Sequence, residues 1–394
     1  MCRPLLIATI AASGLVSLSS NAVAMGFCTQ RQTLREMAAE APVVVRARLV
    51  RSEATCDAKG DKVWKVEWKV EAIVHDDSAS LKPSSIVSAT LHYDVPKGNY
   101  VVLCDYFKGK IEAYRALPAT DKTVDYLKGG LALPIKNRAR QMLYFFNYLE
   151  ESDPEIAKDA FQEFRALSGE SYDFRTFTDG IPVAKLISWV ENKDIPASRR
   201  DTYAALLGHC GGDWGALVFP KLIEEACQAN NPNMIEGLLI GYTLLRPKNG
   251  WSCILQTMGD VNKDFVVRYR ALRAARFFRE VRPSFVDRND LIAGVSILLQ
   301  QSDIADLAIE SLRKWGCWDC HEEVLALDEK ADFHVPIIHR SILRYALQCP
   351  KPKAKEFIRR LPLTDREAIE INTEMLQLES REAVIRALKA AQIW

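Results

Sequence analysis

The segment Cys317-Trp318-Asp319-Cys320-His321 carries the residue types with the most chemistry in this 394-residue chain. It fits the pattern C-x-x-C-H, in which two thiols add to the vinyl groups of a haem and the histidine binds the iron. Such a haem usually has a second axial ligand, and Met258, Met375, His334 and His339 are conceivable, although none is singled out. The same spacing suits a disulfide or a reactive dithiol. Incidental thiols in a turn of a helical repeat are the interpretation that the surrounding periodicity favours.

A second reactive-looking segment is His209-Cys210-Gly211-Gly212. It combines the residue types of a cysteine nucleophile and its base. It also ends a helical pattern, and two glycines are what a helix C-terminus favours, so we interpret it as structural. The chain contains no glycine-rich phosphate loop, no HExxH and no GxSxG, and hence no complete catalytic motif.

Residues 1–24 have the features of an export signal. Arg3 is followed by the apolar run Leu5–Leu18 and by the small-x-small triplet Ala22-Val23-Ala24, after which cleavage is expected. A lipoprotein anchor would need a cysteine directly after the cleavage point, whereas Cys28 lies further along. No later stretch approaches the roughly eighteen consecutive apolar residues of a membrane span. We therefore expect a secreted or periplasmic protein without stable membrane insertion.

The expected mature chain is formally neutral. The full sequence has 52 Lys+Arg and 51 Asp+Glu, and the signal contains Arg3 but no acid, which leaves 51 of each. Charge balance argues against nucleic acid as a partner, because nucleic acid selects for clustered basic surface. Nine of the 10 cysteines follow the signal, and because that number is odd, at least one thiol is free, paired between chains or modified.

Residues 25–125 are expected to form a β-rich domain. The segment Trp64–Val74 is apolar at every second position and charged in between, which predicts a strand with Trp68 on its buried face and Lys69 in water. Further strands are predicted over Val43–Val50, Ile86–Tyr93 and Tyr100–Tyr106, and a short helix over Thr33–Ala41. This content suggests a small barrel or sandwich.

Four features of this domain belong together: Cys28 ahead of a helix, the strand Val43–Ala47, the long strand from Val63, and Gly98–Cys104. Over the first quarter of the chain they resemble netrin-like domains, the OB-type barrels of tissue inhibitors of metalloproteinases. Those inhibitors chelate zinc through the free α-amino group of an N-terminal cysteine, whereas here Met25, Gly26 and Phe27 precede Cys28, so that chemistry is not expected. Cys28, Cys56 and Cys104 are expected to supply one disulfide and one leftover thiol. The pairing stays open, with Cys28–Cys104 preferred.

From Asn137 onward the periodicity becomes helical, after an expected connector over 126–136. Ser152 and Glu155 have the spacing of a capping box, and the unit is a helix, a polar turn and a second helix. This unit recurs, with second helices predicted to begin near Asp153, Ala197, Asn231, Asp264, Asp303, His334 and Thr364.

Two of these second helices, Asp264–Ala275 and Val335–Ala346, combine a polar or proline-containing turn, an arginine and an apolar stripe. They resemble the second halves of HEAT repeats, and the resemblance covers about two thirds of the chain. It implies an all-α HEAT-like solenoid over 137–394, in which each repeat stacks on its sequence neighbours. The expected fold class is therefore α+β and multidomain.

Two functions follow from these observations. The first is an exported, non-enzymatic binding or scaffold protein that recognises a protein or peptide through the helical-repeat surface and needs no cofactor or metal. The alternative is a redox protein, most simply a monohaem electron carrier, with haem c held by Cys317, Cys320 and His321.

Overall fold

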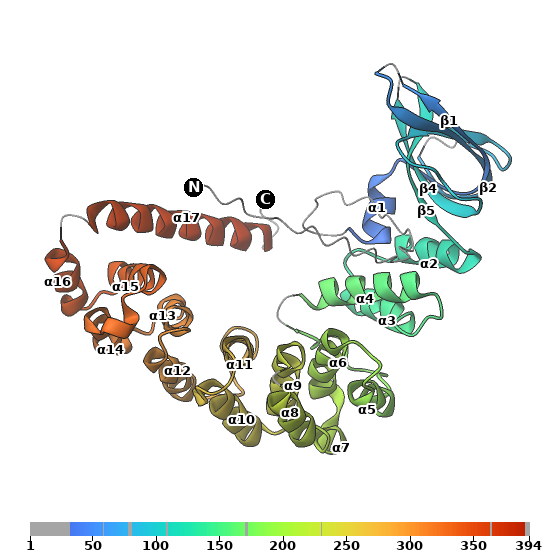
Figure 1. The fold of residues 1–394 in the computed structure, drawn as a ribbon. Helices are drawn as coiled ribbons and strands as arrows, with labels where there is room; N and C mark the ends of the chain where they lie inside the picture. Colours follow the sequence, from blue (N-terminus) through green and yellow to red (C-terminus); the bar gives the residue numbers. More distant parts are fainter. Residues whose placement is uncertain are drawn as a thin grey trace, which may run out of the picture. The chain divides into compact units, whose positions relative to one another are not determined.

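The computed structural model describes residues 32–57, 59–77, 81–107, 109–169, 172–229, 231–362 and 365–390 (Figure 1). The predicted export signal and Cys28 lie outside these residues. The chain divides into two compact units, Met1–Leu117 and Pro118–Trp394, which are described separately below. The boundary thus falls a few residues before the predicted position near 125.

The described residues of the first unit form one short helix and five strands. They are α1 (Leu34–Glu40), β1 (Val43–Cys56), β2 (Lys62–Asp76), β3 (Ile86–Leu91), β4 (Asn99–Phe107) and β5 (Lys110–Pro118). Thr33 and Glu36 form a capping box that fixes the start of α1. The sequence pattern predicted α1 and the first four strands but did not single out β5.

The strands close into a barrel with the order β1-β2-β3-β5-β4 (Figure 1). Strand β1 pairs antiparallel with both β2 and β4, and β3 pairs parallel with β5. The structure therefore selects the barrel over the sandwich, and this barrel is consistent with an OB-like domain.

Strand β2 has the two faces that its alternating pattern predicted. Val66, Trp68 and Val70 are buried in the barrel core, whereas Lys65 and Lys69 are exposed. The indole Nε1 of Trp68 is buried without a hydrogen-bond partner among the described residues, so packing alone holds this ring.

The second unit is a row of helix pairs. The first helices of the pairs are α3 (Arg138–Asn147), α5 (Val183–Glu191), α8 (Phe219–Gln228), α10 (Pro247–Gly259), α12 (Arg288–Ser296), α14 (His321–Leu325) and α16 (Pro352–Arg360). The second helices are α4 (Pro154–Ser168), α6 (Ala197–Cys210), α9 (Pro232–Leu245), α11 (Phe265–Glu280), α13 (Ala305–Lys314), α15 (Pro336–Gln348) and α17 (Arg366–Ala390). Helix α2 (Asp121–Leu131) precedes the row, and the short α7 (Gly212–Ala216) follows α6. Second helices pack on second helices, as for α6 on α9, α9 on α11 and α13 on α15 (Figure 1).

The predicted starts of the second helices are largely confirmed. Asp153, Asn231 and Asp264 each stand immediately before α4, α9 and α11, and Asp153 and Asn231 cap the free backbone N–H groups with their side chains. Helix α6 begins at the predicted Ala197. These starts were predictable because capping chemistry is local.

The expected connector over 126–136 differs from the structure, since α2 continues to Leu131. Gly129 lies within this helix. The ring of Tyr144 occupies the space that a side chain at position 129 would need, so only glycine fits there. The hydroxyl of Tyr144 donates to the carbonyl of Tyr126, 2.7 Å away. Gly129 thus allows close packing and does not mark a break in the helix.

Helices α6 and α9 approach so closely that their backbones touch. A methyl group added to Gly208 would overlap the backbone of Gly241, and one added to Gly237 would overlap the carbonyl of Asp201.

No helix of the described chain is both long enough and apolar enough to cross a membrane.

Candidate functional site

The C-x-x-C-H motif lies in the turn between α13 and α14. Residues Trp318–Cys320 form a 3-10 turn, and His321 begins α14. Cys317 is buried, with 4% of its surface exposed, whereas Cys320 is half-buried with its Sγ 3.7 Å from the hydroxyl of Ser296. The Nδ1 of His321 lies 2.9 Å from the carbonyl oxygen of Trp318.

Tyr345 of α15 covers this turn. Its hydroxyl donates to the carbonyl of Cys317 at 2.5 Å, and the edge of Trp318 meets its ring with 5.1 Å between centroids. Burial raises the pKa of both thiols, although Arg288 opposes this effect at Cys317. Both thiols are therefore protonated at neutral pH and are weak nucleophiles. The structure thus brings Cys317, Cys320 and His321 into one turn, and haem attachment there stays a prediction.

His209 and Cys210 do not form a nucleophile–base pair. The thiol of Cys210 donates to the carbonyl of Leu206, whereas the ring of His209 lies 3.2 Å from the carbonyl of Tyr172 and 3.4 Å from a guanidinium nitrogen of Arg282. Burial, followed by the charge of Arg282, lowers the pKa of His209 to about 4. A neutral histidine can donate to the carbonyl and accept from Arg282, which makes it a satisfied structural group.

Cys104 lies in β4 and contributes to the core of the barrel, fully buried and with a free thiol. Burial raises its pKa to about 12. Cys28, its preferred disulfide partner, lies outside the described residues, and Cys56 is exposed and free. The predicted pairing therefore stays a prediction.

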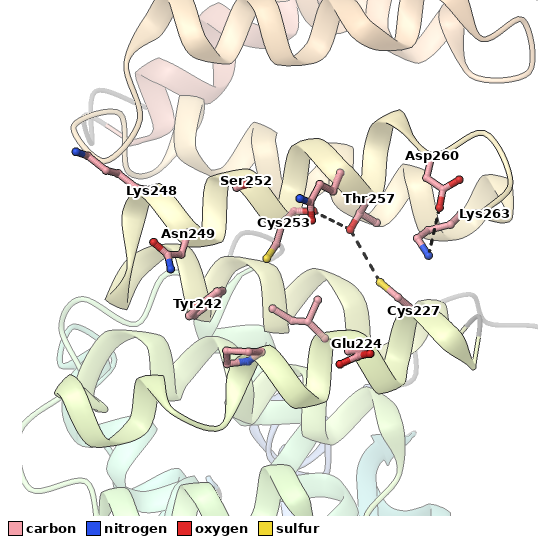
Figure 2. A pocket seen from close by; sticks show the side chains of 13 residues that line it. Glu224, Cys227, Tyr242, Lys248, Asn249, Ser252, Cys253, Thr257, Asp260 and Lys263 are labelled. Atoms are coloured by element: carbon pink, nitrogen blue, oxygen red, sulfur yellow. Dashed lines mark hydrogen bonds and ion pairs between the residues drawn. The ribbon is translucent and has the colours of Figure 1, made fainter.

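A groove of about 650 Å³ lies between the first helices α8 and α10, with Tyr242 of α9 along it (Figure 2). Two thiols line it, Cys227 from α8 and Cys253 from α10, and Cys227 lies 4.0 Å from the hydroxyl of Thr257. Burial raises the pKa of both thiols. The groove thus presents neutral thiols and mixed polarity, which suits a small polar molecule better than a reaction at sulfur.

Sequence reasoning did not single out Cys227 and Cys253. The available signal was their placement on successive first helices, but the register of helix against helix decides whether two such residues share a groove.

No group of three or more His, Cys, Asp or Glu in the described parts of the chain could hold a metal ion. His334 and His339 both contact Asp328, the first at its carbonyl and the second at its carboxylate.

A series of polar contacts joins helices along the row, most of them second helices, and we call this series the inter-helix ladder. At its start, Tyr126 of α2 donates to Asp159 of α4 at 2.7 Å. Further along, Asp201 of α6 accepts from the backbone N–H of Gly237 in α9 and from the hydroxyl of Tyr172, both at 2.6 Å. Burial raises the pKa of Asp201 to about 7, although these two hydrogen bonds oppose the shift.

The ladder continues from α9 to α11 through Glu236. This carboxylate is buried and accepts from Arg270 at 2.9 Å and from Arg273 at 2.8 Å. Two guanidinium groups thus compensate one buried carboxylate, which satisfies the condition for burying a charge.

The last helices are joined in the same way. Arg276 of α11 donates to the hydroxyl of Ser311 in α13 at 3.0 Å. Arg344 of α15 then bridges two helices, since it donates to Glu310 of α13 at 3.1 Å and to Asn372 of α17 at 3.0 Å. The ladder therefore reaches the last helix of the row.

Exposed apolar side chains gather on three of the second helices. They are Phe265 and Val266 of α11, Ile337 of α15, and Ile371, Met375 and Leu378 of α17. On α11, Phe265 is 40% exposed and its ring stacks on Tyr269 with 6.1 Å between centroids and an angle of 4°. Phe265, Tyr269, Arg273 and Arg276 follow one another at helical spacing, and we call these four residues the α11 strip.

No protein-family model, no curated protein and no solved structure matches this chain. The candidate site is therefore interpreted from its geometry alone. In the described residues, the thiols and the histidine discussed above are hydrogen-bonded or protonated, and the α11 strip combines the exposed ring of Phe265 with two half-buried arginines.

Proposed function

We propose that this protein is an exported, non-enzymatic binding or scaffold protein whose second helices recognise a protein or peptide. The observation that carries the proposal is the exposure of aromatic and aliphatic side chains on α11, α15 and α17. Exposed apolar residues that cluster mark interaction sites, whereas singly scattered ones need no explanation. Three of these residues lie on α17 and two on α11.

The α11 strip has the composition of an interface centre. Phe265 and Tyr269 offer stacked apolar area at low conformational cost, and tyrosine and arginine are the residue types that dominate binding energy in protein interfaces. Arg273 and Arg276 are already held by Glu236 and Ser311, so little of their side-chain entropy remains to be lost on binding.

We further propose a HEAT-like identity for the helical unit and a netrin-like one for the barrel. The helix-pair spacing and the first-quarter motifs support these resemblances. Export rests on the pattern of residues 1–24, which is that of a cleaved signal. A solenoid in this setting supplies a long surface, because each repeat stacks only on its neighbours.

The test is a selection of phage-displayed random peptides against the full chain, followed by titration of each selected peptide. We expect Phe265→Ser to weaken binding by about tenfold or more, because a central apolar anchor is lost. The matched control is Leu217→Ser, which removes a side chain that is 73% exposed and lies outside the second helices. Equal effects of the two variants would contradict recognition by the α11 strip.

A further inference from the structure

Helix α17 has an apolar surface that no described residue covers. Ile371, Met375 and Leu378 are 48%, 44% and 55% exposed, and their i, i+4, i+7 spacing places them on one line, which we call the α17 stripe. The side of α17 that packs on α15 is a different one. It carries Asn372 and Leu376, which are buried.

A line of carboxylates runs beside the α17 stripe. Glu367, Glu370 and Glu374 recur at i, i+3 and i+7, and all three are exposed. None of them has a hydrogen-bond or ion-pair partner among the described residues. Glu379, by contrast, is held by Arg313 of α13 at 2.9 Å. These three carboxylates therefore make the edge of the stripe negative from Glu367 to Glu374, and the next charged residue on this line is Arg381.

We propose that the α17 stripe docks a basic amphipathic helix of a partner protein. This inference rests on the proposed function, because it assigns a partner class to one of the second helices. Apolar residues of the partner at i, i+4 and i+7 would cover Ile371, Met375 and Leu378, and lysines or arginines on its flank would face Glu367, Glu370 and Glu374.

A helix fits this surface better than an extended segment does. The backbone groups within α17 are already paired along the helix, so the surface offers only side chains to a ligand. An extended peptide would bring unpaired backbone N–H and C=O groups onto an apolar stripe, whereas a helix satisfies its own.

A second copy of this chain is a poorer occupant. Antiparallel pairing that sets Ile371 opposite Leu378 of the second copy also sets Met375 opposite the exposed carboxylate of Glu374. The symmetric interface would make this contact between an apolar side chain and a carboxylate twice, which is unfavourable. Charge complementarity therefore selects a basic partner.

The probe is a fluorescein-labelled amphipathic peptide of about 18 residues, or five helical turns, with leucines at i, i+4 and i+7 and lysines along the adjacent line. A matched peptide carries glutamates in place of the lysines. Fluorescence anisotropy with the full chain should show that the lysine peptide binds about tenfold more tightly than the glutamate peptide. Met375→Glu should weaken binding of the lysine peptide by about tenfold. Leu217→Glu, at an exposed apolar position elsewhere, should change it by less than about twofold.

If Met375→Glu disturbs the helix, the double variant Glu367→Lys/Glu374→Lys still tests the proposal. Glu367 and Glu374 are exposed, so replacing them should not disturb the fold. It should invert the preference between the two peptides. Equal binding of both peptides, or binding that the α17 variants leave unchanged, would overturn the inference. The proposed function would then still be judged separately by Phe265→Ser. A dimer of the chain that Met375→Glu dissociates would also overturn the basic-helix partner.

Discussion

Glu236 of α9 is held by Arg273 of α11 across the boundary between two helix pairs, at 2.8 Å and with the carboxylate buried. Arg270 donates to the same carboxylate. One acidic residue thus joins two repeats through arginines that lie 34 and 37 residues further along the sequence.

Glu236→Gln should destabilise the helical unit, because two partly buried guanidinium groups lose their counter-charge. We expect a loss of about 1–3 kcal/mol in the free energy of unfolding, measured by urea titration. The control is Asp213→Asn, which weakens the exposed pair with Arg246 and should cost less than about 0.5 kcal/mol. A similar cost for both variants would show that burial of Glu236 adds nothing.

Trp68→Ala should lower the stability of the barrel by about 3–5 kcal/mol, because it empties the centre of the core. Trp68→Phe should cost clearly less, since it keeps most of the bulk and removes the unpaired Nε1. Lys69→Ala, on the exposed face of the same strand, should change stability by no more than about 0.5 kcal/mol. Comparable losses at positions 68 and 69 in denaturant titrations would contradict the assignment of the faces.

Gly237→Ala should cost about 3 kcal/mol, because the added methyl group overlaps the backbone of Asp201 and the packed helices cannot separate freely. Gly259→Ala is the matched control, since its methyl group would meet only Ile297 at 3.6 Å. Thermal unfolding of the two variants measures the difference. A tolerated Gly237→Ala would mean that α6 and α9 are not in backbone contact.

His209 should make the chain less stable in mild acid. Its folded pKa of about 4 lies below the ordinary 6.5, so the unfolded chain binds more protons between these values and stability falls as the pH drops from 6.5 towards 4. Arg282, Arg175 and Asp173 are the charged groups that act on this ring. We expect His209→Gln to flatten the pH dependence by on the order of 2 kcal/mol in urea titrations.

The thiols should differ widely in reactivity. Cys56 is exposed, whereas Cys104 is fully buried and its pKa is raised to about 12. In the folded protein, an alkylating reagent should modify Cys56 at least about tenfold faster than Cys104, as followed by mass spectrometry of peptides. Rapid labelling of Cys104 would indicate that the barrel opens, because its rate should otherwise rise only in urea.

Local signals in the sequence predicted the elements better than their contacts. The period-two pattern around Trp68 and the caps at Asp153 and Asn231 depend on neighbours along the chain, and the structure confirms them. A connector was expected over 126–136, but α2 continues to Leu131, and Gly129 within it packs against Tyr144 of another helix. Propensity and local pattern do not contain that tertiary contact.

The candidate site shows the same limit. The C-x-x-C-H motif was visible at once, yet its packing beneath Tyr345 depends on a helix 28 residues further along. The contacts of Glu236 with Arg273 and of Arg344 with Asn372 depend on the register between helices. The α17 stripe could have been found as a helical line of apolar residues, and so could Phe265 with Tyr269 in the α11 strip, but the sequence does not say which of these lines remain uncovered.

The backbone contact between α6 and α9 bears on how the row responds to load. Where Gly208 meets Gly241, the backbones of α6 and α9 touch without a side chain between them, so sliding or pivoting at this point would break main-chain packing. Between α11 and α13, by contrast, the rotatable side chain of Arg276 reaches across to Ser311. Pulling on the row, or wedging a partner against it, should therefore bend the arginine-bridged end first, while α6 and α9 move together as one stiff block.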